Sequence, residues 1–182
     1  MATVYPNKRA AFSKTKGAIT GPSCAKGALS WNANGLSLYA LPGTSGGIRR
    51  AKVGKAVRRL GANKLVCLQE TGALAYEDAA FDSQLPEHRV FYGNYKKDIA
   101  GVIVAVPFSM LKTHVAKRIR LPPDVCGHIL AIGVSSKKTG KIDLVICSVY
   151  LPSRGDKTPC LEALLRLPPG PSTSSPGTRT FP

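Results

Sequence analysis

The chain has 182 residues, which is room for one domain of ordinary size with short tails. Hydrophobic residues make up 43% of it, so it can form a packed core and lacks the composition of a disordered chain. The 26 Lys and Arg residues against 10 Asp and Glu residues give a formal net charge of +16. That charge favours a polyanionic partner such as nucleic acid, with a basic surface that has no specific partner as the alternative.

Cysteine content and hydropathy indicate the cellular compartment in which the protein is expected. The 5 cysteines are odd in number and none lies at C-x-x-C spacing, which argues against a zinc site or a disulfide framework and favours a reducing compartment. The longest clean apolar run, residues 101–108, is far shorter than the roughly 18 residues of a membrane span. We expect an intracellular protein, nuclear or cytoplasmic, without a membrane partner. The acid-free N-terminal region before Glu70 leaves an organelle transit peptide as the alternative.

The first half of the chain predicts a flexible basic arm followed by a strand, a helix and a strand. Residues 1–26 contain proline and glycine without sustained periodicity, which is typical of an arm. A short strand is expected over residues 27–32 and a second over residues 64–69. Between them, residues 48–60 place apolar side chains at helical spacing, and Gly61 suits the end of that helix. Such an order indicates a βαβ unit.

The second half predicts mostly strands. A short helix is expected over residues 76–84 and another over residues 161–167, and a disordered Pro/Ser-rich tail over residues 168–182. Gly140 suits a hairpin turn between the last two strands. The strands themselves are expected at residues 89–92, 100–106, 114–121, 127–135 and 142–150.

Four segments lie where open α/β sheets carry their functional sites, at the ends of strands. They are Ser30 to Leu36, Leu68 to Thr71, Gly101 to Val104 and Ser148 to Ser153. In this order and spacing they resemble the endonuclease/exonuclease/phosphatase superfamily, above all the endonuclease domains of non-LTR retrotransposons and the apurinic endonucleases. The resemblance covers about residues 28–153.

The resemblance implies a fold and an activity. The expected fold class is α/β, a partial sandwich of the endonuclease/exonuclease/phosphatase type, with one mixed sheet and flanking helices and with its second half missing. This truncated domain would occupy residues 27–167. The implied function is a Mg-dependent phosphodiesterase, an endonuclease that acts on DNA.

The resemblance also carries over individual residues. Glu70 matches the family's metal-binding glutamate, and a carboxylate is the ligand that Mg²⁺ or Mn²⁺ prefers. Asn34 matches a position in the metal shell, and Asn32 matches an asparagine beside the scissile phosphate. Tyr150 matches a tyrosine whose hydroxyl meets the phosphate. The alternatives are ordinary turn chemistry for the two asparagines and a buried aromatic ring for Tyr150.

Basic side chains complete the expected nucleic-acid contacts. The helix at residues 48–60 carries Arg49, Arg50 and Lys52 on its polar face, and Arg154 follows the last motif. A solvated surface is the alternative reading of each. His128 is a lesser candidate, because a single histidine between apolar residues is more often packed in the structure.

The sequence departs from the family in two respects. Ser153 stands where the family usually has Asn, and the Asp-x-Asn and Ser-Asp-His motifs are absent after Tyr150. We therefore expect the chain to bind Mg²⁺ weakly and to have little or no nuclease activity alone. The alternatives are a basic, non-catalytic nucleic-acid-binding protein and a phosphatase of the same superfamily. The sequence says nothing about the oligomeric state.

Overall fold

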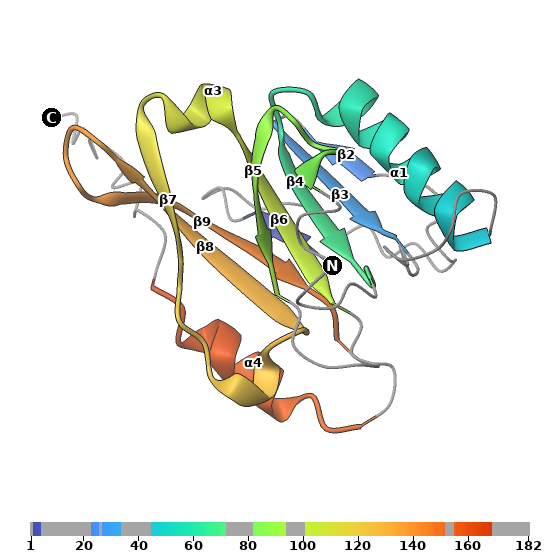
Figure 1. The fold of residues 1–182 in the computed structure, drawn as a ribbon. Helices are drawn as coiled ribbons and strands as arrows, with labels where there is room; N and C mark the ends of the chain where they lie inside the picture. Colours follow the sequence, from blue (N-terminus) through green and yellow to red (C-terminus); the bar gives the residue numbers. More distant parts are fainter. Residues whose placement is uncertain are drawn as a thin grey trace, which may run out of the picture.

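The computed structural model describes residues 2–4, 23–25, 27–33, 45–71, 82–93, 101–151 and 155–168. Two β-sheets pack face to face, and each has helical segments on its outer face, so that the molecule has four layers (Figure 1). None of the helices in these described parts is long and apolar enough to cross a membrane.

The first sheet contains five strands and one parallel pair. Helix α1 (Ser45–Gly61) connects the two parallel strands and packs on the outer face of the sheet through Val53 and Val57. The predicted strand–helix–strand order is therefore confirmed. The remaining neighbours pair antiparallel, in the order β2 (Ser23–Ala25), β3 (Ala28–Asn32), β4 (Leu65–Gln69), β6 (Val102–Pro107) and β5 (His88–Tyr92).

The second sheet contains four strands that are all antiparallel. Its order is β1 (Ala2–Val4), β9 (Ile142–Val149), β8 (Ile129–Ser136) and β7 (His114–Arg118). Gly140 has a φ of +69° in the turn between β8 and β9, a conformation that favours glycine, so the predicted hairpin is confirmed. Short helical segments complete the fold: α3 (Phe108–Leu111) lies between β6 and β7, the 3₁₀ turn η2 (Pro123–Val125) lies between β7 and β8, and α4 (Thr158–Leu165) follows β9.

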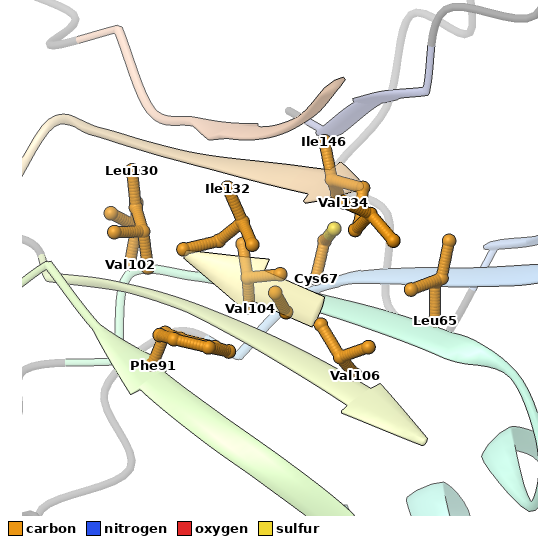
Figure 2. Packing of buried hydrophobic residues seen from close by; sticks show 11 residues of the cluster. Leu65, Cys67, Phe91, Val102, Val104, Val106, Leu130, Ile132, Val134 and Ile146 are labelled. Carbon is orange, nitrogen blue, oxygen red and sulfur yellow. The ribbon is translucent and has the colours of Figure 1, made fainter. Parts of the chain in front are cut away.

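The largest apolar cluster lies between the sheets (Figure 2). Cys67 and Val104 enter it from the first sheet, and Ile132 and Ile146 meet them from the second. Because side chains alternate along a strand, Val66, on the other face of β4, packs toward α1 instead. Strand β4 is thus covered on both faces, which explains why its sequence is a continuous apolar run.

The predicted α/β sandwich is confirmed, but its division into sheets differs from the prediction. The sequence predicts one mixed sheet, whereas β7, β8, β9 and β1 form a second sheet on top of the first. Apolar alternation shows that a segment is a strand, but it does not show which strand is its neighbour. The second layer of the sandwich is therefore present within these 182 residues.

Two further expectations differ at the ends of the chain. The predicted flexible arm contributes two short strands, β1 and β2, whose pairing partners lie elsewhere in the sequence and leave no local signal. The last helix begins at Thr158 rather than at residue 161, and Pro159 in its first turn suits a helix start. The predicted helix at residues 76–84 lies mostly outside the described residues, and so does the tail after residue 168.

Candidate functional site

Three of the predicted site residues follow strands that run toward the same end of the sandwich (Figure 1). Asn32 ends β3, Glu70 follows β4, and Tyr150 follows β9. The parallel register places Asn32 beside Gln69, immediately before Glu70. Tyr150 comes from the other sheet, and its hydroxyl lies close enough to Glu70 for the two side chains to interact. We call this end of the sandwich, with Asn32, Glu70 and Tyr150, the site edge.

Glu70 projects from a turn that its neighbours hold on both sides. Its φ is +51°, in the left-handed region that side chains other than Gly, Asn and Asp seldom adopt. The Ala33 N–H donates to the Gln69 carbonyl at 2.7 Å, and the Thr71 N–H donates to the Gly101 carbonyl at 3.1 Å. The peptide groups before and after Glu70 are therefore bonded to β3 and to the start of β6. Such a residue in an unfavourable conformation is often found at a functional site.

Tyr150 presents its hydroxyl to the Glu70 carboxylate. Burial raises the pKa of Tyr150 above its ordinary value, and Glu70 raises it further through the side-chain hydrogen bond and its negative charge. Each of these causes favours the protonated phenol. At neutral pH the hydroxyl is consequently a hydrogen-bond donor at the site edge, the role in which it can meet an oxygen of a phosphate.

His128 lies against Tyr150. Its carbonyl accepts the Tyr150 N–H at 2.8 Å, and the two rings stack with centroids 6.3 Å apart and planes 17° apart. Among the residues that the structure describes, the buried His128 Nδ1 atom has no hydrogen-bond partner, and the same holds for the Oγ1 atom of Thr71, next to Glu70. Buried polar atoms usually have hydrogen-bond partners. Two buried polar atoms with unmet hydrogen-bonding capacity therefore lie beside Glu70 and Tyr150. Thr71 was not among the predicted site residues; its only sequence signal is its position after Glu70.

Of the other predicted residues, the structure describes only Lys52 with its side chain. Asn34 and Arg154 lie outside the described residues, and so do the side chains of Arg49 and Arg50, although both belong to α1. Lys52 is exposed on α1. Helix α1 covers the outer face of the five-stranded sheet, so the Lys52 side chain lies on the layer outside that sheet.

Arg118 is a cation at this edge that sequence reasoning missed. It ends β7, and its guanidinium Nη2 donates to the carbonyl of Tyr92 at the end of β5. Strand β5 is two strands from β4, so at the usual spacing Arg118 reaches the sheet about 10 Å from Gln69. The sequence signal for a role of Arg118 is the basic run from Lys117 to Arg120, and such runs are common on protein surfaces.

The donors at the site edge suit a hard divalent cation that is shared with a phosphate. Within the described ranges, no group of three or more His, Cys, Asp and Glu side chains is placed to hold a metal ion. Glu70 is the carboxylate that two strands hold in place, and Asn32 lies beside it with an amide. Mg²⁺ commonly keeps several waters and binds through one or two carboxylates together with substrate phosphates. The residues present fit that kind of coordination, with Glu70 as the anionic ligand.

No protein-family model and no curated protein matches this sequence. Among solved structures, the chain is similar to D. rerio TDP2 complexed with a single-stranded DNA product, at 18% identity and a TM-score of 0.48, over 76% of this chain and 52% of that one. It is similar to a truncated Caenorhabditis elegans TDP2, at 17% identity and a TM-score of 0.45, over 74% and 50% of the two chains.

A third similar structure is the endonuclease/exonuclease/phosphatase from Bacteroides vulgatus, at 17% identity and a TM-score of 0.38, over 66% of this chain and 51% of that one. The chain thus spans about half the length of each of these three structures.

Proposed function

We propose that the site edge binds a phosphodiester of nucleic acid, most readily DNA, together with a divalent cation held by Glu70. The observation that carries this proposal is the contact between Glu70 and Tyr150, which come from different sheets, beside Asn32. A carboxylate, a phenol and an amide at the ends of three strands from the two sheets offer one surface on which a phosphate and a hard cation can bind together.

Each residue has a distinct part in this proposal. Glu70 is the anionic ligand, and its turn keeps the carboxylate in place before the substrate arrives. Tyr150 donates its hydroxyl proton and Asn32 its amide N–H to phosphate oxygens. A bound Mg²⁺ would neutralise charge on the phosphate oxygens. Arg118 adds a positive charge along the same edge for a neighbouring phosphate of the strand.

We further propose that the 182-residue chain alone binds nucleic acid but cleaves it poorly or not at all. Hydrolysis of a phosphodiester needs a group that activates water, in addition to groups that hold the phosphate. Tyr150 is protonated at neutral pH, and Glu70 is committed to the cation. The described part of the site edge therefore supports binding better than it supports the attack of water.

Binding of a fluorescent single-stranded oligonucleotide, followed by anisotropy, tests the proposal. With Mg²⁺ we expect wild-type affinity to rise about tenfold over EDTA, which corresponds to about 1.4 kcal/mol. Glu70→Gln should abolish the Mg²⁺ response and leave binding in EDTA intact. The matched control is Glu87→Gln, which removes an exposed carboxylate before β5 and should keep the full response. An equal response in Glu70→Gln and wild type would reject the proposed cation site.

Plasmid nicking in Mg²⁺ tests the second part. We expect the chain to produce no more nicked plasmid than a buffer control. Efficient nicking that disappears in Glu70→Ala would show that the site edge is catalytically complete and that the proposed lack of cleavage is wrong.

A metal-independent nucleic-acid-binding protein is the second candidate, favoured by the exposed cations of α1, namely Lys52, Lys55, Arg58 and Arg59. It predicts strongly salt-dependent binding that is indifferent to Mg²⁺ and to Glu70. Replacement of Lys55 and Arg59 by Ala would then weaken binding more than replacement of Arg118.

A further inference from the structure

A buried amide joins three strands behind the site edge. Gln69 is only 2% exposed, and its side-chain nitrogen donates to Ser30 Oγ in β3 at 3.4 Å and to Ser148 Oγ in β9 at 3.3 Å. The Ser148 hydroxyl, itself fully buried, donates in turn to the Leu68 carbonyl of β4 at 3.0 Å. One bond thus stays within the five-stranded sheet, and two others cross to the four-stranded sheet.

The members of this network have a regular relation to the site edge. Ser30 lies two residues before Asn32, and Ser148 lies two residues before Tyr150. Residues two apart in a strand point to the same face, so each serine is the inward neighbour of a site residue. Gln69 directly precedes Glu70 and pairs with Asn32 in the parallel ladder.

We propose that Gln69 is a positioning residue, whose amide sets the register of β3, β4 and β9 and thereby holds Glu70 and Tyr150 within reach of each other. The consequence for cation binding rests on the proposed function. The positioning itself concerns a contact that needs no cation.

The apolar core alone does not provide this register. The cluster between the sheets consists of side chains such as Val104, Ile132 and Ile146, whose attraction is not directional. Hydrogen bonds require defined distances and angles, and a buried amide left unpaired costs about 1–3 kcal/mol. Arrangements in which the sheets shift relative to each other would break the bond from Gln69 to Ser148, and the buried network selects against them.

The contact between Glu70 and Tyr150 can be followed by NMR without any metal. In protein with ¹³C-labelled tyrosine rings, the Tyr150 signal is assigned with Tyr150→Phe. Glu70→Gln removes the neighbouring charge and should shift that signal in the wild-type background. In the Ser148→Ala and Gln69→Met backgrounds, we expect the shift caused by Glu70→Gln to fall to less than half.

Two control backgrounds separate positioning from general loosening. Val145→Ala truncates a buried side chain of the same strand that faces α4, and it should lower stability while the shift persists. Ser148→Thr keeps the hydroxyl and should also keep the shift. If Gln69→Met does not fold, Ser148→Ala decides, because it removes a single oxygen atom.

Three results would overturn the positioning role: a full shift in both Ser148→Ala and Gln69→Met, a loss of the shift in Val145→Ala as well, or no shift in the wild-type background.

Binding of Mn²⁺, followed by electron paramagnetic resonance, is the separate readout for the proposed function. We expect Ser148→Ala to weaken it about tenfold, the lower end for residues that orient a metal ligand. The wild-type protein could bind no Mn²⁺ while the ring signals behave as expected. That result would refute the cation site but would not affect the positioning role.

Discussion

The two ends of β4 turn through the same backbone conformation with different residues. Before the strand, Asn63 has a φ of +59°, and after it Glu70 has a φ of +51°. Asparagine adopts left-handed backbone readily, whereas for glutamate it costs about 1 kcal/mol or more. The same geometry is therefore relaxed at one end of the strand and strained at the other.

The surroundings of the two turns differ in the same sense. At the Asn63 end, the polar groups are paired: the Lys64 N–H bonds to Gly61, and His88 Nε2 meets the Lys64 carbonyl at 3.0 Å. At the Glu70 end, Thr71 Oγ1 and His128 Nδ1 have no partner. The Asn63 end of the strand is thus relaxed and hydrogen-bonded, while the Glu70 end retains strain and unmet hydrogen-bonding capacity where the site residues gather.

The largest expected effect concerns Cys67, midway between the two turns. Burial raises the pKa of its thiol from 9.0 to about 12, with a smaller contribution from Cys147. The unfolded chain then loses this proton first, so the stability is complete below pH 9 and declines as the pH rises toward 12. Urea unfolding gives the free energy of unfolding at pH 8 and at pH 10. Between these two pH values, this free energy should fall by about 1.4 kcal/mol more in wild type than in Cys67→Ala. Equal losses would mean that water reaches the centre of β4.

A smaller effect separates the turns directly. Glu70→Gly should raise the free energy of unfolding by up to about 1 kcal/mol, because glycine removes the left-handed penalty. The matched change Asn63→Gly should alter it by less than about 0.5 kcal/mol, since asparagine carries little of that penalty. Urea unfolding of both variants measures the difference. A Glu70→Gly variant less stable than wild type would show that the contacts of the Glu70 side chain outweigh its backbone strain.

The smallest expected effect compares cations at the two ends of the sandwich. Arg118→Ala should weaken oligonucleotide binding about threefold. It should also reduce the slope of log Kd against the logarithm of the salt concentration by somewhat less than one. Lys138→Ala removes an exposed cation from the hairpin turn between β8 and β9, at the opposite end, and should change neither quantity. Anisotropy titrations at several salt concentrations distinguish the two. Equal losses would indicate binding without a defined path along the protein.

Much of the fold follows from local patterns in the sequence. The apolar spacing of α1, the continuous apolar run of β4 and the glycine of the β8–β9 turn were each sufficient to predict the element. The site residues Glu70 and Tyr150 were predicted from the resemblance of their segments to the endonuclease/exonuclease/phosphatase superfamily, and each segment lies at the end of a predictable strand. Their contact was not a local property, since it depends on how two separate sheets pack.

Three features that sequence reasoning missed involve partners far away in the sequence. Gln69 bonds to a serine 79 residues away, and Arg118 bonds to a carbonyl 26 residues away. Strand β1 pairs with β9 across most of the chain. In each case the residue looks ordinary in its own segment, and only the tertiary arrangement gives it a role.

The pairing of β1 with β9 has a practical consequence for handling the protein. Ala2 lies opposite Ser148 and Val4 opposite Ile146, so the chain enters β1 from the side of Tyr150. Ala2 therefore lies at the end of β1 nearest the site edge. An affinity tag or fluorescent label fused there would crowd an incoming oligonucleotide, whereas one fused after α4, which packs on the outer face of the second sheet, would start from another layer of the molecule.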